Sequence, residues 1–155
     1  MLDRKEFLRI VESTPLVSID LIVRNDQAEV LLGRRNNAPA MGYWFVPGGH
    51  IMKSESLSQA FERITLTELG ESFDIGISRL IGVFEHHYAD NLANDAFGTH
   101  YIAMGMQLQI TDQLPALPCQ QHARYQWMAV DVLLNDPQVH QNTKDYFIAS
   151  RGLRV

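Results

Sequence analysis

The spacing of apolar residues along the chain predicts most of its secondary structure. Runs rich in β-branched and aromatic residues, bounded by turn-forming residues, have the character of strands. These runs cover residues 16–23, 28–35, 44–46, 80–88, 99–110 and 125–128. The runs at 80–88 and 99–110 are separated by a polar loop, so we expect them to pair as antiparallel neighbours.

Apolar residues at three- and four-residue steps predict the helices. Residues 3–13 form a short amphipathic helix that ends before Pro15, because proline holds the preceding residue in an extended conformation. A helical turn is expected over 130–134, and a closing helix from 139 to about 150. The intervening segment 111–123 contains two prolines and reads as a loop.

The central helix carries the clearest signals. Ser54 or Ser56 can cap its start, and Gly70 suits its end. Its predicted core-facing stripe consists of Leu57, Ala60, Phe61 and Ile64. Strands before and after this helix, with further helices near both ends of the chain, predict an α+β fold. We expect a mixed β-sheet flanked by helices in α/β/α layers.

Length and composition narrow the class of protein. A chain of 155 residues and 17.6 kDa suits one domain, 1–155, without internal repeats or a linker. The formal net charge of −5 argues against a nucleic-acid partner, and an anionic substrate would need local cations or a metal ion. The single Cys119 excludes an intramolecular disulfide. Without a membrane-length apolar run or a signal-peptide core, the expected location is the cytoplasm.

Candidate chemistry starts at Pro47-Gly48-Gly49, which by itself predicts a turn or short loop, and at the helix that follows. Glycines allow the backbone to approach a ligand, and a helical carboxylate such as Glu68 can hold a hard metal ion that binds a diphosphate. Arg35, at a strand end, is either solvated surface or a bidentate phosphate ligand. Asp20 is the one charge inside its strand, and its simplest interpretation is an outward-facing carboxylate.

The spacing of these residues resembles the Nudix box, Gly-x5-Glu-x7-Arg-Glu-U-x-Glu-Glu-x-Gly-U, in which U is bulky and aliphatic. The matching positions are Gly49, Glu55, Arg63, Glu68 and Gly70. Ile64 and Thr67 stand where the box has glutamates, and Thr65 and Glu71 occupy positions marked U. The chain therefore lacks most of the carboxylates that bind additional metal ions for attack at phosphorus, but retains one.

A box depleted in this way resembles the GDP-mannose mannosyl hydrolases, a Nudix subfamily, and the likeness extends from Phe7 to about Phe147. Its motifs include Gly42-Tyr-Trp-Phe-Val-Pro-Gly-Gly, Ala60-Phe-Glu-Arg, Thr99-His-Tyr101 and Gln121-His122. The resemblance implies Mg²⁺-dependent hydrolysis of GDP-mannose, or a related GDP-hexose, to GDP and free sugar. Water would attack the anomeric carbon with inversion.

The resemblance also implies roles for individual residues. One Mg²⁺ per subunit, for which Mn²⁺ is expected to substitute, would be bound by Gly48, Glu68 and Gln121. His122 would be the general base, and Arg63, Asp20, His86 and Tyr101 would complete the catalytic set, with Arg63 in a structural role as well. The substrate-binding residues would be Leu2, Asp3, Phe7, Arg35 and His50. Segment 1–13 would contribute to a homodimer interface.

Two alternatives remain at this stage. A pyrophosphohydrolase that cleaves another nucleotide sugar at phosphorus would want glutamates at Ile64 and Thr67. A non-catalytic nucleotide-sugar-binding module would not need Glu68, Gln121 and His122 together. His50 is a further departure, because the subfamily has an arginine there, and histidine is not reliably cationic at neutral pH. We therefore expect the rate, pH dependence or substrate preference of this protein to differ from those of the subfamily.

Overall fold

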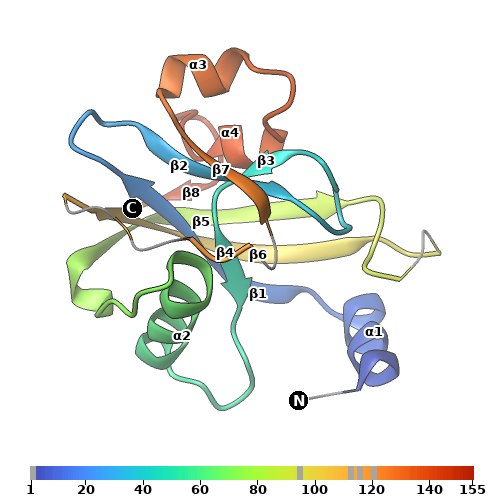
Figure 1. The fold of residues 1–155 in the computed structure, drawn as a ribbon. Coiled ribbons are helices and arrows are strands. Elements are labelled where there is room, and N and C mark those ends of the chain that lie inside the picture. The colour runs from blue at the N-terminus through green and yellow to red at the C-terminus, as the bar shows by residue number, and fades with distance from the viewer. Residues whose placement is uncertain (1–2, 94–95, 112–113, 115–116, 120–121) are drawn as a thin grey trace.

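The computed structural model describes residues 3–93, 96–111, 114, 117–119 and 122–155 (Figure 1). The helices are α1 (Arg4–Ser13), α2 (Leu57–Leu69), α3 (Val130–Asn135) and α4 (Gln141–Asp145), with a 3₁₀ turn η1 (Ile75–Ile77). The strands are β1 (Leu16–Arg24), β2 (Val30–Arg35), β3 (Trp44–Phe45), β4 (Gly48–His50), β5 (Ser78–Tyr88), β6 (Thr99–Gln109), β7 (His122–Met128) and β8 (Leu153–Arg154).

Within these residues the strands form one mixed sheet, which confirms the predicted fold class. Its order is β3-β2-β1-β6-β5-β8, with β4 paired to β1 and β7 paired to β2. Strands β1 and β6 run parallel from the Leu16↔Tyr101 pair to the Arg24↔Gln109 pair. Strands β5 and β6 are antiparallel, as the sequence predicted. None of the helices in the described ranges is long and apolar enough to cross a membrane.

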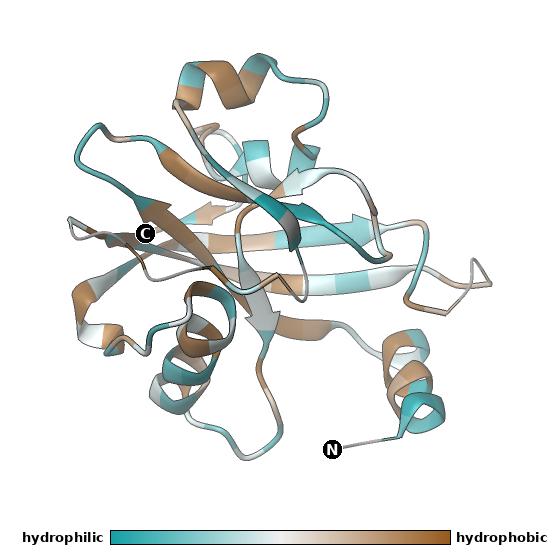
Figure 2. Cartoon of the chain, viewed as in Figure 1, coloured by the Kyte–Doolittle hydropathy of each residue, from teal (hydrophilic) through white to brown (hydrophobic). Residues whose placement is uncertain are grey.

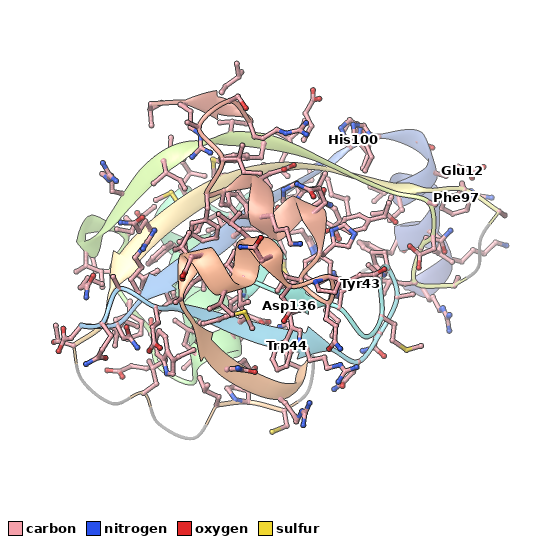
Figure 3. All side chains as sticks on the ribbon, turned by 90° about the horizontal axis from the view of Figure 1, so that it is seen from above. Glu12, Tyr43, Trp44, Phe97, His100 and Asp136 are labelled. Carbon is pink, nitrogen blue, oxygen red and sulfur yellow. The ribbon has the colours of Figure 1, made fainter. Side chains whose placement is uncertain are left out.

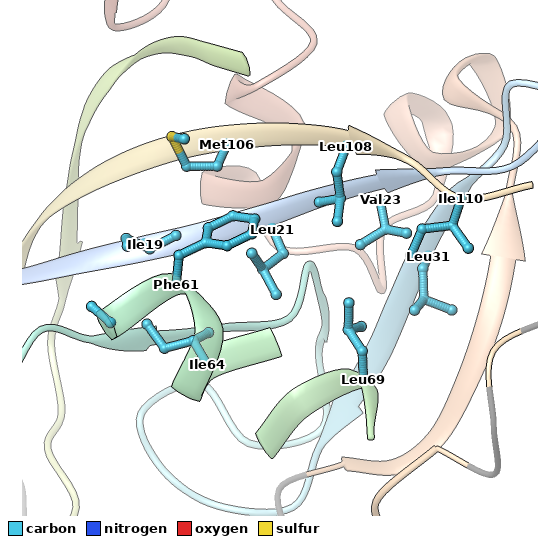
Figure 4. Packing of buried hydrophobic residues seen from close by; sticks show 11 residues of the cluster. Ile19, Leu21, Val23, Leu31, Phe61, Ile64, Leu69, Met106, Leu108 and Ile110 are labelled. Carbon is cyan, nitrogen blue, oxygen red and sulfur yellow. The ribbon is translucent and has the colours of Figure 1, made fainter. Parts of the chain in front are cut away.

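Two apolar cores lie on opposite faces of the sheet because side chains alternate along β1. Ile19 and Leu21 face α2, where Phe61 packs against them (Figure 4). Ile22 belongs to the other core, together with Leu133 of α3 and Tyr146 at the end of α4. Helix α2 therefore covers one face, and the C-terminal segment covers the other (Figure 1).

The ends of α2 match the sequence signals, and its core stripe matches in part. Ser56 forms a capping box with Gln59, and Gly70 ends the helix with φ of 78°, in the left-handed conformation that favours glycine. Ala60, Phe61 and Ile64 are buried as expected. Leu57 is 51% exposed, so the prediction that it joins the core was wrong. It occupies the first helical turn, before the helix reaches the sheet.

Residues Gly48–His50 form strand β4 and not the loop that Pro-Gly-Gly suggested. The strand pairs with β1 through Ser18↔His50, Ile19↔Gly49 and Asp20↔Gly48. A Cβ on Gly48 would lie 2.7 Å from both the Asp20 carboxylate and the Ile19 carbonyl oxygen. Glycine is needed here because only a residue without a side chain lets the backbone lie so close to β1.

Three further boundaries differ from the sequence prediction. Strand β7 begins at His122, so that histidine lies in the sheet and not in the preceding loop. Helix α4 ends at Asp145 because the following amides bond three residues back, as in Ile148 N–H to the Asp145 carbonyl. The chain then turns at Gly152 into β8, an edge strand on β5 that the sequence did not reveal.

Candidate active site

The polar ends of several strands point to one region of the sheet. Figure 2 shows the apolar centres of the strands and hydrophilic colouring where β2 and β5 end, on the right of the view. Arg35 is the last residue of β2, and it pairs with His122 at the start of β7, after a shift of register between Arg34 and Arg35. Tyr88 ends β5 opposite Thr99 of β6. The candidate residues gather around these ends.

Glu68 and His122 are in direct contact. Their Oε2 and Nε2 atoms lie 3.3 Å apart, and the residues are only 3% and 5% exposed. Glu68 comes from the last turn of α2, and His122 comes from the first residue of β7. The structure thus joins the predicted metal ligand to the predicted general base, from segments more than fifty residues apart in the chain.

The position of the His122 ring depends on a glycine that sequence reasoning missed. A Cβ on Gly33 of β2 would lie 2.5 Å from the His122 Cγ and Nδ1 atoms. Tyr125 also contacts the His122 ring, with ring centroids 5.3 Å apart in an edge-on arrangement. Nδ1 is buried and has no hydrogen-bond partner among the described residues. A lone glycine inside a strand was the available signal for this close approach.

Glu68 offers one buried carboxylate, the type of ligand that a hard divalent ion prefers. Within the described ranges no group of three or more His, Cys, Asp or Glu side chains converges to hold a metal. An ion at Glu68 would therefore be completed by neutral oxygens and water, which is the coordination that Mg²⁺ accepts. The predicted ligand Gly48 lies on β4, whereas Gln121, like the predicted substrate contact Leu2, lies outside the described residues.

Arg63 is occupied by contacts that hold the loop before α2. Its Nε donates to Glu55 Oε1 at 2.6 Å, and its Nη2 donates to Glu55 Oε2 and the His50 carbonyl, both at 2.9 Å. The hydrogen bond from Arg63 is the main reason that the pKa of Glu55 falls to about 2. These contacts support the structural role of Arg63, and its catalytic role stays a prediction.

His50 lies beside these contacts of Arg63 and faces α1. Its ring lies 5.6 Å from that of Phe7, so two predicted substrate contacts touch each other. Burial, followed by the charge of Arg63, lowers the pKa of His50, which makes the neutral form dominant at neutral pH. Asp3, another predicted contact, forms a capping box with Glu6 at the start of α1.

A second cluster surrounds Asp20 of β1, next to the C-terminal segment. Its Oδ2 accepts a hydrogen bond from the Tyr146 hydroxyl at 2.6 Å and lies 3.8 Å from His86 Nδ1. Ser18 Oγ lies 3.3 Å from Oδ1. Asp20 is half-buried, so the simple interpretation of an outward-facing charge does not hold: the C-terminal segment covers this face of β1.

His86 and its neighbour His87 take opposite faces of β5, because side chains alternate along a strand. His86 is 3% exposed, and its Nε2 is buried without a hydrogen-bond partner among the described residues. Burial lowers its pKa, although the charge of Asp20 acts in the opposite direction. His87 is exposed and stacks on His100 of β6, away from the cluster.

Tyr101 and Arg35 border the same cluster. The Tyr101 ring meets Tyr88 edge-on with centroids 6.2 Å apart, and burial raises the pKa of both hydroxyls. The Arg35 guanidinium lies over the ring of Phe45, 5.3 Å from its centroid. A cation, a carboxylate and several neutral donors are thus arranged around one end of the sheet.

Comparison with known proteins identifies the family that has this architecture. The model of the NUDIX domain matches residues 14–149, nearly the whole chain. This chain belongs to the NUDIX domain family. It is a Nudix hydrolase by family, and such enzymes generally use divalent metal ions such as Mg²⁺.

Individual relatives agree with this assignment. The low-salt glycan biosynthesis protein Agl8 of Haloferax volcanii is 41% identical over 107 residues, which cover 69% of this chain and 67% of Agl8. The MutT protein of Methanosarcina mazei superposes with a TM-score of 0.69 at 24% identity, covering 87% of this chain and 92% of that one. A MutT NUDIX hydrolase from Burkholderia pseudomallei superposes with a TM-score of 0.66 at 25% identity, covering 84% of this chain and 94% of that one.

The departures from the Nudix box have a structural explanation. Ile64, in place of a glutamate, is 1% exposed and belongs to the core under α2. A Cβ on Gly49 would lie 3.2 Å from Ile64 Cγ1, so the β4 backbone packs directly on this side chain. Thr65, at an aliphatic box position, is fully buried, and its hydroxyl accepts a hydrogen bond from the Phe73 amide at 3.0 Å. The Nudix helix thus presents apolar contacts where the box has an acid.

The candidate site is also in contact with residues of the C-terminal segment that sequence reasoning passed over. Tyr146 reaches Asp20 across 126 positions of the chain, and it is 3% exposed. His140 caps α4 and stacks on Phe45. A tyrosine and a histidine in an apolar C-terminal run carry no local signal for a site, because the fold alone places them beside Asp20 and Phe45.

Proposed function

We propose that this Nudix hydrolase cleaves GDP-mannose, or a related GDP-hexose, by attack of water at the anomeric carbon. The observation that carries the proposal is the single buried carboxylate of the Nudix helix, Glu68, beside a core isoleucine, Ile64, at a position where the box has glutamate. Attack at phosphorus benefits from several metal ions, whereas departure of a diphosphate from carbon needs only local charge neutralisation. Similarity to a glycan biosynthesis protein supports a sugar-linked substrate.

The residues of the candidate active site would have separate roles in this reaction. Mg²⁺, held by Gly48, Glu68 and Gln121, would neutralise charge on the departing diphosphate. Arg35 offers a bidentate guanidinium to the same group from the end of β2. Asp20, His86 and Tyr101 would contact the sugar side of the substrate. Because water would displace the diphosphate in one step, from the opposite face of the anomeric carbon, the products would be GDP and a hexose with inverted anomeric configuration.

His122 is the proposed general base. His122 Nε2 lies 3.3 Å from Glu68 Oε2, and with the proton on Nε2 the imidazole would keep a lone pair on Nδ1, the nitrogen without a partner among the described residues. A neutral imidazole held by a carboxylate is a suitable acceptor for a proton from water near pH 7. His122 is 5% exposed, so little bulk water reaches it in the free protein.

The remaining proposals concern assembly and location. Segment 1–13 is expected to contribute Leu2, Asp3 and Phe7 to the nucleotide site of a second copy in a homodimer. Phe7 and Leu8 of α1 are only half-buried within one chain, which leaves apolar surface for such a contact. We propose cytoplasmic function, where nucleotide sugars would be available as substrates, without a nucleic-acid or membrane partner.

Product analysis tests the reaction directly. The protein is incubated with GDP-mannose and Mg²⁺ in ¹⁸O-labelled water, and products are followed by proton NMR and mass spectrometry. We expect GDP together with β-mannose as the first anomer, and the label in the sugar. GMP with mannose 1-phosphate, and label in a phosphate, would show attack at phosphorus and overturn the proposal. Mg²⁺-dependent binding without turnover would instead favour a nucleotide-sugar sensor.

His50→Arg should raise the turnover of GDP-mannose. The lowered pKa of His50 leaves it uncharged at neutral pH, whereas arginine supplies a permanent cation toward a leaving diphosphate. We expect an increase of about tenfold in kcat, since one charge-assisted hydrogen bond contributes about 1.5 kcal/mol or more. His87→Arg, at an exposed position facing away from the cluster, is the control. An unchanged or lower kcat would show that His50 is not a weakened leaving-group contact.

A further inference from the structure

His140 is held in one tautomer by the start of α4. Its Nδ1 accepts a hydrogen bond from the Asn142 amide at 3.1 Å, as the N-cap of the helix. A ring nitrogen that accepts a hydrogen bond carries no proton, so in the neutral ring the proton lies on Nε2. His140 therefore offers one N–H donor whose direction is set by the helix cap.

Aromatic rings fix the plane of this donor. His140 stacks on Phe45 with centroids 4.7 Å apart and an interplanar angle of 21°, and Tyr43 meets it edge-on at 5.3 Å. Figure 3 shows Tyr43 and Trp44 beside the C-terminal helices, and Trp44 bridges to Val139. Tyr88 lies 5.4 Å from the same ring. His140 is thus oriented by β3, β5 and α4 together.

Phe45 also joins His140 to the cationic part of the site. The guanidinium of Arg35 lies over the same aromatic ring that His140 stacks on. Beside this cation the cluster has the imidazole of His140, on the same Phe45 ring, and it has a carboxylate in Asp20, 3.8 Å from the His86 Nδ1 atom. A diphosphate suits the Arg35 end, but it would be repelled by a carboxylate. Hydroxyl groups suit the other end, because a carboxylate accepts from them and an N–H donates to them.

We propose that His140 is a specificity-determining residue that donates its Nε2–H to a hydroxyl of the hexose, while Asp20 accepts from another hydroxyl. This inference rests on the proposed function, since it assigns one contact of the same nucleotide-sugar substrate. The hexose then lies between β5 and α4, and the diphosphate passes Arg35 on its way to Glu68.

The surroundings keep His140 a neutral donor over the working pH range. Burial is the largest influence on its pKa, which falls to about 4. His86 and Arg35 lower it further, while the carboxylates of Asp145 and Asp90 act in the opposite direction. Protonation would also remove the acceptor that caps α4. The hydrogen-bonding state of His140 should therefore stay constant between pH 6 and 8 and change only in more acidic solution, as the pH falls toward about 4.

The experiment compares His140→Asn with the wild type in binding GDP-mannose and GDP. Asparagine is a good N-cap, so the variant keeps the helix start but loses the Nε2 donor. We expect the Kd for GDP-mannose to rise about tenfold with the Kd for GDP unchanged, and the melting temperature to fall slightly, because asparagine does not stack on Phe45. His87→Asn, an exposed histidine on the opposite face of β5, is the matched control.

Deoxy analogues of GDP-mannose, each lacking one hydroxyl, identify the contact. The wild type should bind one analogue about tenfold more weakly than GDP-mannose, and His140→Asn should bind that analogue and GDP-mannose equally. Equal loss of affinity for GDP and GDP-mannose in the variant, or no loss at all, would overturn the inference. If the wild type neither binds nor hydrolyses GDP-mannose, the proposed function fails, irrespective of His140.

Discussion

Glu68→Gln should abolish the Mg²⁺-dependent reaction, with kcat/KM falling by about 10³-fold. Glutamine keeps the size of the side chain but removes the one buried carboxylate of the Nudix helix, which is 3% exposed. An amide binds a divalent ion more weakly than a carboxylate and also loses its acceptor charge for His122, 3.3 Å away. The melting temperature should hardly change, because a neutral group replaces a buried charge.

Calorimetric titration with Mg²⁺ and steady-state kinetics measure this result. Glu62→Gln is the matched control, since Glu62 lies on the same helix and is exposed. Chelation of the metal by EDTA should reduce the wild type to the level of Glu68→Gln and have no further effect on the variant. A variant that binds Mg²⁺ normally would exclude Glu68 as the metal ligand. Full activity in the variant would remove the basis of the proposed site.

Gly33→Ala is expected to impair catalysis through His122 without altering any residue that the sequence marked as functional. The new methyl group would lie 2.5 Å from two atoms of the imidazole, so the ring has to move away. Displacement of a catalytic group by about 1 Å can cost about 10²-fold in rate, and we expect a loss of this size in kcat. Overpacking should also lower the stability by about 1–3 kcal/mol.

Kinetics and thermal unfolding of Gly33→Ala separate these two effects. At temperatures well below its melting point the variant should remain folded but slow. Gly76→Ala is the control, because a methyl group there meets only the end of the Asp74 side chain in an exposed turn. The double variant Gly33→Ala, His122→Ala should be no slower than His122→Ala alone. A wild-type rate in Gly33→Ala would show that the ring position over Gly33 is not the catalytic one.

The ends of helix α2 and the faces of strand β5 could be predicted from the sequence, because they depend on residues that are neighbours in the chain. Ser56 and Gly70 mark the ends of α2 because a hydroxyl can cap free amides and glycine tolerates a positive φ. The alternation of His86 and His87 followed from strand geometry alone. Pro47-Gly48-Gly49 misled as a turn signal, because glycine serves equally where two strands come very close.

For the candidate site, too, the sequence did not reveal contacts between residues that are far apart in the chain. Asp20 looked like a surface charge because its hydrogen-bond donor, Tyr146, lies 126 residues further along the chain. His122 looked like a loop residue because segment 111–123 contains two prolines, yet pairing with Arg35 draws it into the sheet. Gln121 and Leu2 stay predictions, since they lie outside the described residues.

The sequence by itself determined the fold class, the Nudix helix and the loss of its acidic residues, because these depend on residues close together in the chain. Only the tertiary structure decided that Glu68 contacts His122, that Gly33 makes room for the imidazole, and that α4 supplies His140. Such contacts depend on how distant segments pack, and the pairing of β2 with β7 and the stacking of His140 on Phe45 bring those segments together.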